Sequence, residues 1–84
     1  MPVDHDANTM TGWEYSAMTI IRTEMARRRM SYAKLNEALA AIGVEENERN
    51  LRNKIARGRF SAVFFLQCLK AIGVRELDIT QAEV

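Results

Sequence analysis

The chain has 84 residues with 12 Lys and Arg, 11 Asp and Glu and a single Cys, which gives a formal net charge of +1. A chain of this length forms one small domain with one modest core and leaves no room for a separate catalytic domain. The near-neutral total excludes the strong basicity of proteins that coat DNA without specificity, although residues 22–59 carry ten basic and five acidic side chains.

Neither secretion nor membrane insertion is expected from the sequence. The first nine residues contain no basic segment and no apolar core, and no apolar run approaches the roughly 18 residues that a membrane span needs. The lone Cys68 cannot form an intramolecular disulfide, and its apolar neighbours indicate a small buried side chain in a reducing compartment. We therefore predict a cytoplasmic protein.

The folded domain is predicted at residues 11–79, between a flexible arm at 1–10 and a frayed end at 80–84. Thr11-Gly-Trp-Glu14 fits a capping box, with Met10 and Tyr15 at the positions of a hydrophobic staple. A helix is expected from here to about Arg28. Its buried stripe is predicted to comprise Ala17, Met18, Ile21 and Met25, with Trp13 at the core edge.

The second helix is predicted to begin after Ser31, with Met30 and Leu35 as its staple, and to end near Ala41. Gly43 follows where a left-handed cap favours a residue without a Cβ. The expected apolar face of this helix comprises Tyr32, Leu35, Ala38, Leu39 and Ile42.

A third helix is expected from the cap Asn47 to Gly58, and a fourth from the cap Ser61 to the terminator Gly73. The fourth helix is apolar on nearly every side, so we expect it to be the centre of the core. Phe60 and Phe65 are its predicted staple, and Leu77 and Ile79 are expected to add one short final turn. The fold class is therefore all-α, a compact bundle of four to five helices.

The third helix contains the main candidate site. Its stretch from Arg49 to Arg59 holds five basic residues, two Asn and no acid, and Leu51 and Ile55 share the face that can pack. Arginine suits guanine edges and asparagine suits adenine edges. The residues predicted to meet bases or adjacent phosphates are Arg49, Asn50, Asn53 and Arg57. The residues predicted to clamp the DNA backbone are Lys34, Arg52, Lys54 and Arg59.

Structural roles that involve no DNA binding stay open for the same residues. A charge run is usually a solvated face, and Asn50 and Asn53 could instead hydrogen-bond neighbouring loops. Arg27, Arg28 and Arg29 are explained by the helix dipole and by solubility. Acidic side chains at the start of the third helix would repel phosphates, which shifts the expected contacts to its middle and C-terminal half. These acids are Glu45, Glu46 and Glu48.

Three segments carry a resemblance to a known fold. They are Arg28-Arg-Met-Ser-Tyr-Ala-Lys-Leu-Asn-Glu-Ala-Leu, Leu51-Arg-Asn-Lys-Ile-Ala-Arg-Gly-Arg and Phe64-Phe-Leu-Gln-Cys-Leu-Lys-Ala-Ile-Gly-Val. Together they resemble the lambda-repressor-like (XRE-type) helix-turn-helix domain. The resemblance implies a transcriptional regulator that binds double-stranded DNA with the helix at about 47–57, and a homodimer would suit paired half-sites.

A closer resemblance is to a small bacterial domain family of unknown function, over about residues 13–75. It rests on the patterns Tyr-Ala-x-Leu, Glu-Arg-Asn-x-Arg-Asn-Lys, Arg-Gly-x-Phe-Ser-Ala and Leu-Gln-Cys. This family implies a fold but no established activity. The spacing from Leu35 to Gly58 exceeds the usual repressor-like spacing, so the second helix or its turn is expected to be longer.

No enzymatic activity, cofactor, metal site or small-molecule substrate is indicated. His5 is a lone imidazole in the predicted arm, and no phosphate-cradling glycine loop is present. The alternative function is a helical protein-protein interaction module without DNA binding, which pairs with a partner or a second copy through the apolar fourth helix or the acidic ends. Exposure of Val63, Phe64 or Phe65 would favour association, whereas an unobstructed basic face would favour DNA binding.

Overall fold

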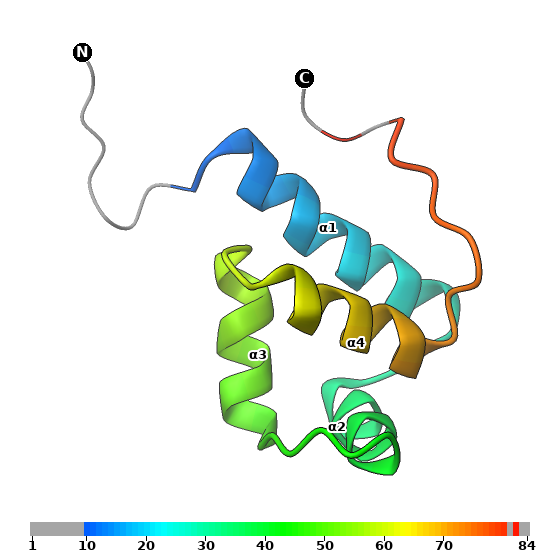
Figure 1. The fold of residues 1–84 in the computed structure, drawn as a ribbon. Helices are drawn as coiled ribbons and strands as arrows, with labels where there is room; N and C mark the ends of the chain where they lie inside the picture. Colours follow the sequence, from blue (N-terminus) through cyan, green and yellow to red (C-terminus); the bar gives the residue numbers. More distant parts are fainter. Residues whose placement is uncertain (1–9, 81, 83–84) are drawn as a thin grey trace.

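The computed structural model describes residues 10–80 and residue 82. This part of the chain contains four helices and no strand, which confirms the all-α class (Figure 1). The helices are α1 (Gly12–Arg27), α2 (Tyr32–Ala41), α3 (Glu48–Arg57) and α4 (Ala62–Ile72). The arm predicted at residues 1–10 lies outside the described residues except for Met10, and the frayed end predicted at 80–84 overlaps them only at Thr80 and Ala82.

Each helix begins at the predicted capping residue. In the capping box of α1, the Thr11 hydroxyl accepts a hydrogen bond from the Glu14 N–H at 3.1 Å, and the Glu14 carboxylate accepts one from the Thr11 N–H at 2.8 Å. Ser31, Asn47 and Ser61 each accept from the backbone N–H three residues further on. Such a cap contributes about 1 kcal/mol to the stability of the helix. The local sequence therefore marks where each of the four helices starts.

The end of α3 is fixed by a glycine in close contact with α1. Gly58 has φ +68°, in the left-handed region that favours glycine. A Cβ added at this position would lie 2.1 Å from the backbone carbonyl oxygen of Glu14. The C-terminus of α3 therefore packs directly against the first turn of α1, which fixes the orientation of α3.

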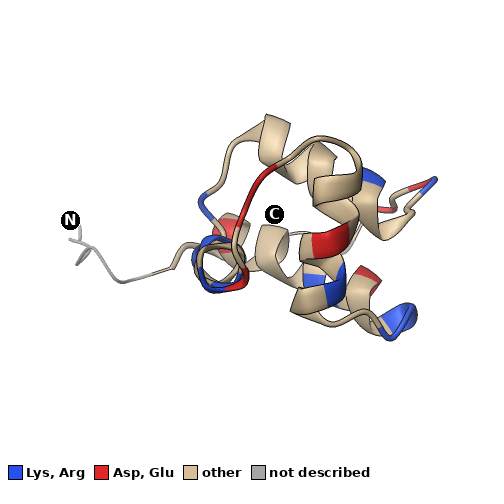
Figure 2. Cartoon of the chain, turned by 90° about the horizontal axis from the view of Figure 1, so that it is seen from below, with Lys and Arg blue, Asp and Glu red and all other residues tan. Residues whose placement is uncertain are grey.

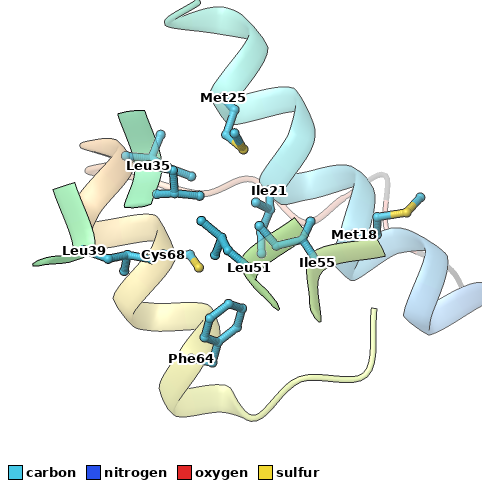
Figure 3. Packing of buried hydrophobic residues seen from close by; sticks show 10 residues of the cluster. Met18, Ile21, Met25, Leu35, Leu39, Leu51, Ile55, Phe64 and Cys68 are labelled. Atoms are coloured by element: carbon cyan, nitrogen blue, oxygen red, sulfur yellow. The ribbon is translucent and has the colours of Figure 1, made fainter. Parts of the chain in front are cut away.

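The four helices enclose one core. α1 and α2 each pack against both α3 and α4, so every helix contributes to the shared interior (Figure 1). Figure 3 shows side chains from all four helices pointing toward one another. The fully buried side chains are Ile21, Leu35, Leu39, Leu51, Ile55 and Cys68. The predicted Phe60–Phe65 contact is confirmed, with stacked rings at a centroid distance of 5.8 Å.

Several sequence predictions about apolar residues were wrong. α4 contributes four buried apolar side chains, Phe64, Cys68, Leu69 and Ile72, but it is not covered on every side, because its outer side leaves Val63 and Leu66 each 64% exposed. Ile42 is the C-cap of α2 and lies beyond the buried face, so it is exposed. Trp13 and Tyr15 are exposed as well.

The predicted final turn is a single hydrogen-bonded turn and not a helix, with the Ala82 N–H donating to the Ile79 carbonyl at 3.0 Å. Residues 74–79 form no helix, and Ile79 is exposed. The Asp78 carboxylate instead accepts a hydrogen bond from the Thr80 N–H at 2.9 Å, a local side-chain turn that competes with a helix. The described residues therefore form a bundle of four helices. None of these helices is long and apolar enough to cross a membrane.

Candidate nucleic-acid interface

The exposed face of α3 brings four predicted side chains together. Leu51 and Ile55 are fully buried on the inner side of the helix. The opposite side carries Arg49, Asn50, Asn53 and Arg57, all of which are exposed. No hydrogen bond or ion pair occupies these four side chains among the residues the structure describes. Their guanidinium and amide groups are therefore directed outward with their donors available.

A shallow, open groove lies at one edge of this face. Its lining comprises Glu48, Arg49, Arg52 and Asn53. The sides of the groove are thus two arginines and an amide, with one carboxylate at the N-terminal end. This chemistry accepts an anion or the polar edge of a base more readily than an apolar ligand.

The residues predicted to clamp the DNA backbone differ from the four side chains on the exposed face of α3, because they already have acidic partners. Arg52 pairs with Glu48 at 2.8 Å, one turn back on the same helix. Lys54 pairs with Glu46 and lies 5.0 Å from the ring centroid of Phe64, so it is held toward α4. A phosphate that approached Arg52 or Lys54 would compete with a carboxylate.

The other two predicted clamps also have acidic neighbours. Arg59 pairs with Glu14 at 2.8 Å, which links the end of α3 to the first turn of α1. The hydrogen bond from the Thr11 N–H and the positive charge of Arg59 hold the pKa of Glu14 below its usual value. Lys34 has only a loose contact of 4.0 Å with Glu37, and both side chains are largely exposed. Among the clamps, Lys34 is therefore the least constrained.

The acids at the start of α3 are partly neutralised. Glu46 and Glu48 are two of the three carboxylates expected to repel phosphates, and each faces a basic partner on α3. Figure 2 shows this arrangement as red segments in the loop before α3 and blue segments on the helix itself. The unpaired positive charge of α3 consequently lies on Arg49 and Arg57.

The structure adds a basic residue that sequence reasoning missed. Arg22 on α1 donates a hydrogen bond from its Nε to the Tyr32 hydroxyl at 3.2 Å. On α3, the Arg52 guanidinium carbon lies 4.8 Å from the centroid of the Tyr32 ring. Tyr32 was predicted as a core-edge residue, and it is half-buried. No local pattern identifies Arg22, because only the tertiary fold brings these three helices together.

The arginines at the end of α1 have a different environment. Arg28 donates to the Glu24 carboxylate at 2.8 Å, to the Glu24 carbonyl at 3.0 Å and to the Gly73 carbonyl at 3.5 Å. Glu24 is buried and also pairs with Arg27 at 3.2 Å. Arg28 therefore joins α1 to the end of α4, a structural role beyond the dipole and solubility roles expected from sequence.

Cys68 is a core residue, as predicted. Its side chain is fully buried, and burial together with the nearby negative charge of Glu46 raises the pKa of the thiol to about 12. The described residues contain no group of three or more His, Cys, Asp or Glu side chains arranged to hold a metal ion. His5 lies outside the described residues.

Comparison with known proteins identifies a family without a known activity. The profile of DUF6471, a domain of unknown function, matches residues 13–77. The match covers most of the chain, which therefore belongs to this family, and the predicted resemblance to a family of unknown function is confirmed. No curated protein and no solved structure matches the chain significantly.

Proposed function

We propose that this member of the DUF6471 family is a DNA-binding transcriptional regulator of the lambda-repressor-like (XRE-type) helix-turn-helix class, with α3 as its recognition helix. One observation carries the proposal. Arg49, Asn53 and Arg57 occupy the exposed face of a helix whose opposite face is locked into the core, and their side chains have no partner among the described residues. Arginine and asparagine are the residue types that read guanine and adenine in the major groove.

The arrangement of α2 and α3 supports the helix-turn-helix class. The two helices pack against each other and are joined by residues 42–47, a connection longer than the usual three or four residues. This longer connection accounts for the spacing between Leu35 and Gly58. Because Gly58 holds the far end of α3 against α1, the helix presents its outer face as a rigid surface.

The proposed mode of binding follows from which charges are free. Arg49 and Arg57 would meet bases or adjacent phosphates, with Asn50 and Asn53 between them. Arg52, Lys54, Arg59 and Lys34 would contribute at the margins, where phosphates must compete with carboxylates. With few free charges, one domain would bind weakly, so a homodimer on two half-sites is the proposed assembly.

A binding role, not catalysis, is proposed. The protonated, buried thiol of Cys68 is unsuited to nucleophilic attack, since the thiolate is the reactive form. A buried free thiol also suits the reducing cytoplasm, where we propose that the protein acts.

The test is fluorescence anisotropy of labelled random duplex DNA, titrated with protein at several salt concentrations. The variant Arg49→Ala/Arg57→Ala is compared with Lys70→Ala/Arg75→Ala, which removes the same charge from α4 and the segment after it. We expect the α3 variant to show a log-log salt slope shallower by up to about 1.8, since each phosphate neutralised contributes roughly 0.9. Equal slopes in the two variants, or no salt-dependent binding by the parent protein, would contradict the proposal.

A second candidate function rests on the outer side of α4. Val63 and Leu66 lie one turn apart and are both strongly exposed, whereas Phe64 is buried and Phe65 is half-buried. Exposed apolar neighbours favour association with a protein partner or a second copy of the chain. Sedimentation equilibrium of the parent and of Leu66→Glu tests self-association through this side. The alternative predicts that the parent protein associates and that the Leu66→Glu variant is monomeric.

A further inference from the structure

Tyr32 lies between two arginines that come from different helices. Arg22 of α1 donates to the Tyr32 hydroxyl at 3.2 Å, and Arg52 of α3 lies over the ring at 4.8 Å from its centroid. Tyr32 is itself the first residue of α2. The three side chains therefore form one cluster, the Tyr32 cluster, which joins three consecutive helices.

The Tyr32 cluster has spare hydrogen-bond donors. Arg22 uses its Nε for the tyrosine, which leaves its two terminal nitrogens. The Tyr32 hydroxyl accepts a hydrogen bond, but its own proton has no acceptor among the residues the structure describes. Arg22 and Arg52 are exposed, so these donors can reach a ligand. Two guanidinium groups and a hydroxyl proton form the donor set that a phosphate oxygen accepts.

The cluster is continuous with the exposed face of α3. Arg52 contacts the Tyr32 ring and also lines the groove formed with Arg49 and Asn53. Arg52 is therefore common to the α3 face and the Tyr32 cluster. The carboxylate that pairs with Arg52, Glu48, also lines the groove. Glu48 limits the contribution of Arg52 to phosphate binding, so Arg22 carries the positive charge of the cluster that no carboxylate of the described residues neutralises.

We infer that the Tyr32 cluster binds a backbone phosphate of duplex DNA, with Arg22 and the Tyr32 hydroxyl as its principal donors. This inference rests on the proposed function and extends it, because it adds α1 to the interface and assigns a role to Arg22. The hydrogen bond to Tyr32 holds the Arg22 side chain in place before DNA arrives. Less conformational entropy is then lost when the phosphate binds.

The test compares Arg22→Gln with Arg75→Gln, which removes one exposed charge after α4, in the same salt-dependent DNA titration. We expect Arg22→Gln to weaken binding by about three- to tenfold at low salt and to make the salt slope shallower by about 0.9. Arg22→Lys retains the charge and should restore the slope. Tyr32→Phe removes the hydroxyl alone and should weaken binding by about two- to threefold without changing the slope.

The outcomes separate this inference from the proposal it rests on. If Arg22→Gln behaves like Arg75→Gln while Arg49→Ala/Arg57→Ala is impaired, the Tyr32 cluster is not a phosphate site and the proposed function stands. If the parent protein shows no salt-dependent binding, both the phosphate site and the proposed function are contradicted. An unchanged affinity in Tyr32→Phe would remove the hydroxyl from the site. The salt slope reports phosphates neutralised and not the folded fraction, so partial destabilisation of a variant does not imitate the effect.

Discussion

Two arginine-rich regions of this small domain have opposite roles. At the end of α1, Arg28 is bound to the buried Glu24 and to the Gly73 carbonyl of the segment that follows α4. On the outer face of α3, Arg49 and Arg57 have no partner among the described residues. In the sequence, both regions are clusters of positively charged residues. In the folded protein, one stabilises the contact between helices and the other is available for a ligand.

The difference shows that the free charge of a surface matters more than its total charge. Five basic residues lie between Arg49 and Arg59, yet Arg52, Lys54 and Arg59 are paired with carboxylates. A partner with many phosphates could contact the two unpaired arginines of α3 without displacing a carboxylate. The small net charge of +1 is therefore compatible with a localised anion-binding face.

The largest expected effect is at the anchor of α3. Gly58→Ala should destabilise the protein by about 3 kcal/mol or more, because it adds a backbone clash to the cost of a left-handed conformation. Gly43→Ala is the matched control, since Gly43 also has φ +85° but a Cβ there would meet nothing within 4 Å. The control should cost only about 1 kcal/mol. Urea unfolding measures both, and equal losses would show that the close approach to Glu14 does not constrain α3.

The next effect concerns the structural arginines. Glu24→Ala removes the buried carboxylate that two arginines share and should cost about 2 kcal/mol, less than a fully buried pair because Arg28 is partly exposed. Glu37→Ala removes the exposed partner of Lys34 and should change the free energy of unfolding by less than about 0.5 kcal/mol. Thermal unfolding of the two variants compares them. If the Glu24 variant is as stable as the Glu37 variant, the ion pairs of Glu24 with Arg27 and Arg28 do not stabilise the fold.

The smallest effect concerns the neutralised bases of α3. Glu48→Gln frees Arg52 and should raise affinity for duplex DNA by about two- to threefold at low salt, while stability changes by less than about 0.5 kcal/mol. Glu45→Gln removes a carboxylate that has no ion pair among the described residues and serves as the control for net charge. If both variants bind DNA equally well, the Glu48–Arg52 pair does not mask Arg52.

The sequence predicted those features that depend on residues close to one another in the chain. The four caps, the left-handed Gly43 and most of the buried stripe residues follow from local hydrogen bonding and from the helical period, and these predictions are confirmed. The exposed set on α3 was predicted for the same reason, since Leu51 and Ile55 fix which side faces inward.

The remaining features depend on contacts between distant segments. The bond from Arg28 to Gly73 joins residues 45 positions apart, and no periodicity encodes it. The contact between Arg22 and Tyr32 likewise depends on how α1 and α2 are placed around α3 and α4. The sequence left the exposure of Val63 open and did not indicate that of Leu66, because an apolar helix has no polar side to mark its outer face.

NMR can show directly whether α3 presents a DNA-binding face. Backbone amide resonances of the labelled protein would be followed while random duplex DNA is added at low salt. We expect the resonances of residues 49–57 and of the start of α2 to shift most, and those of the outer side of α4 and of the segment after it to stay unchanged. Shifts confined to α4 around Val63 and Leu66, or none at saturating DNA, would contradict it.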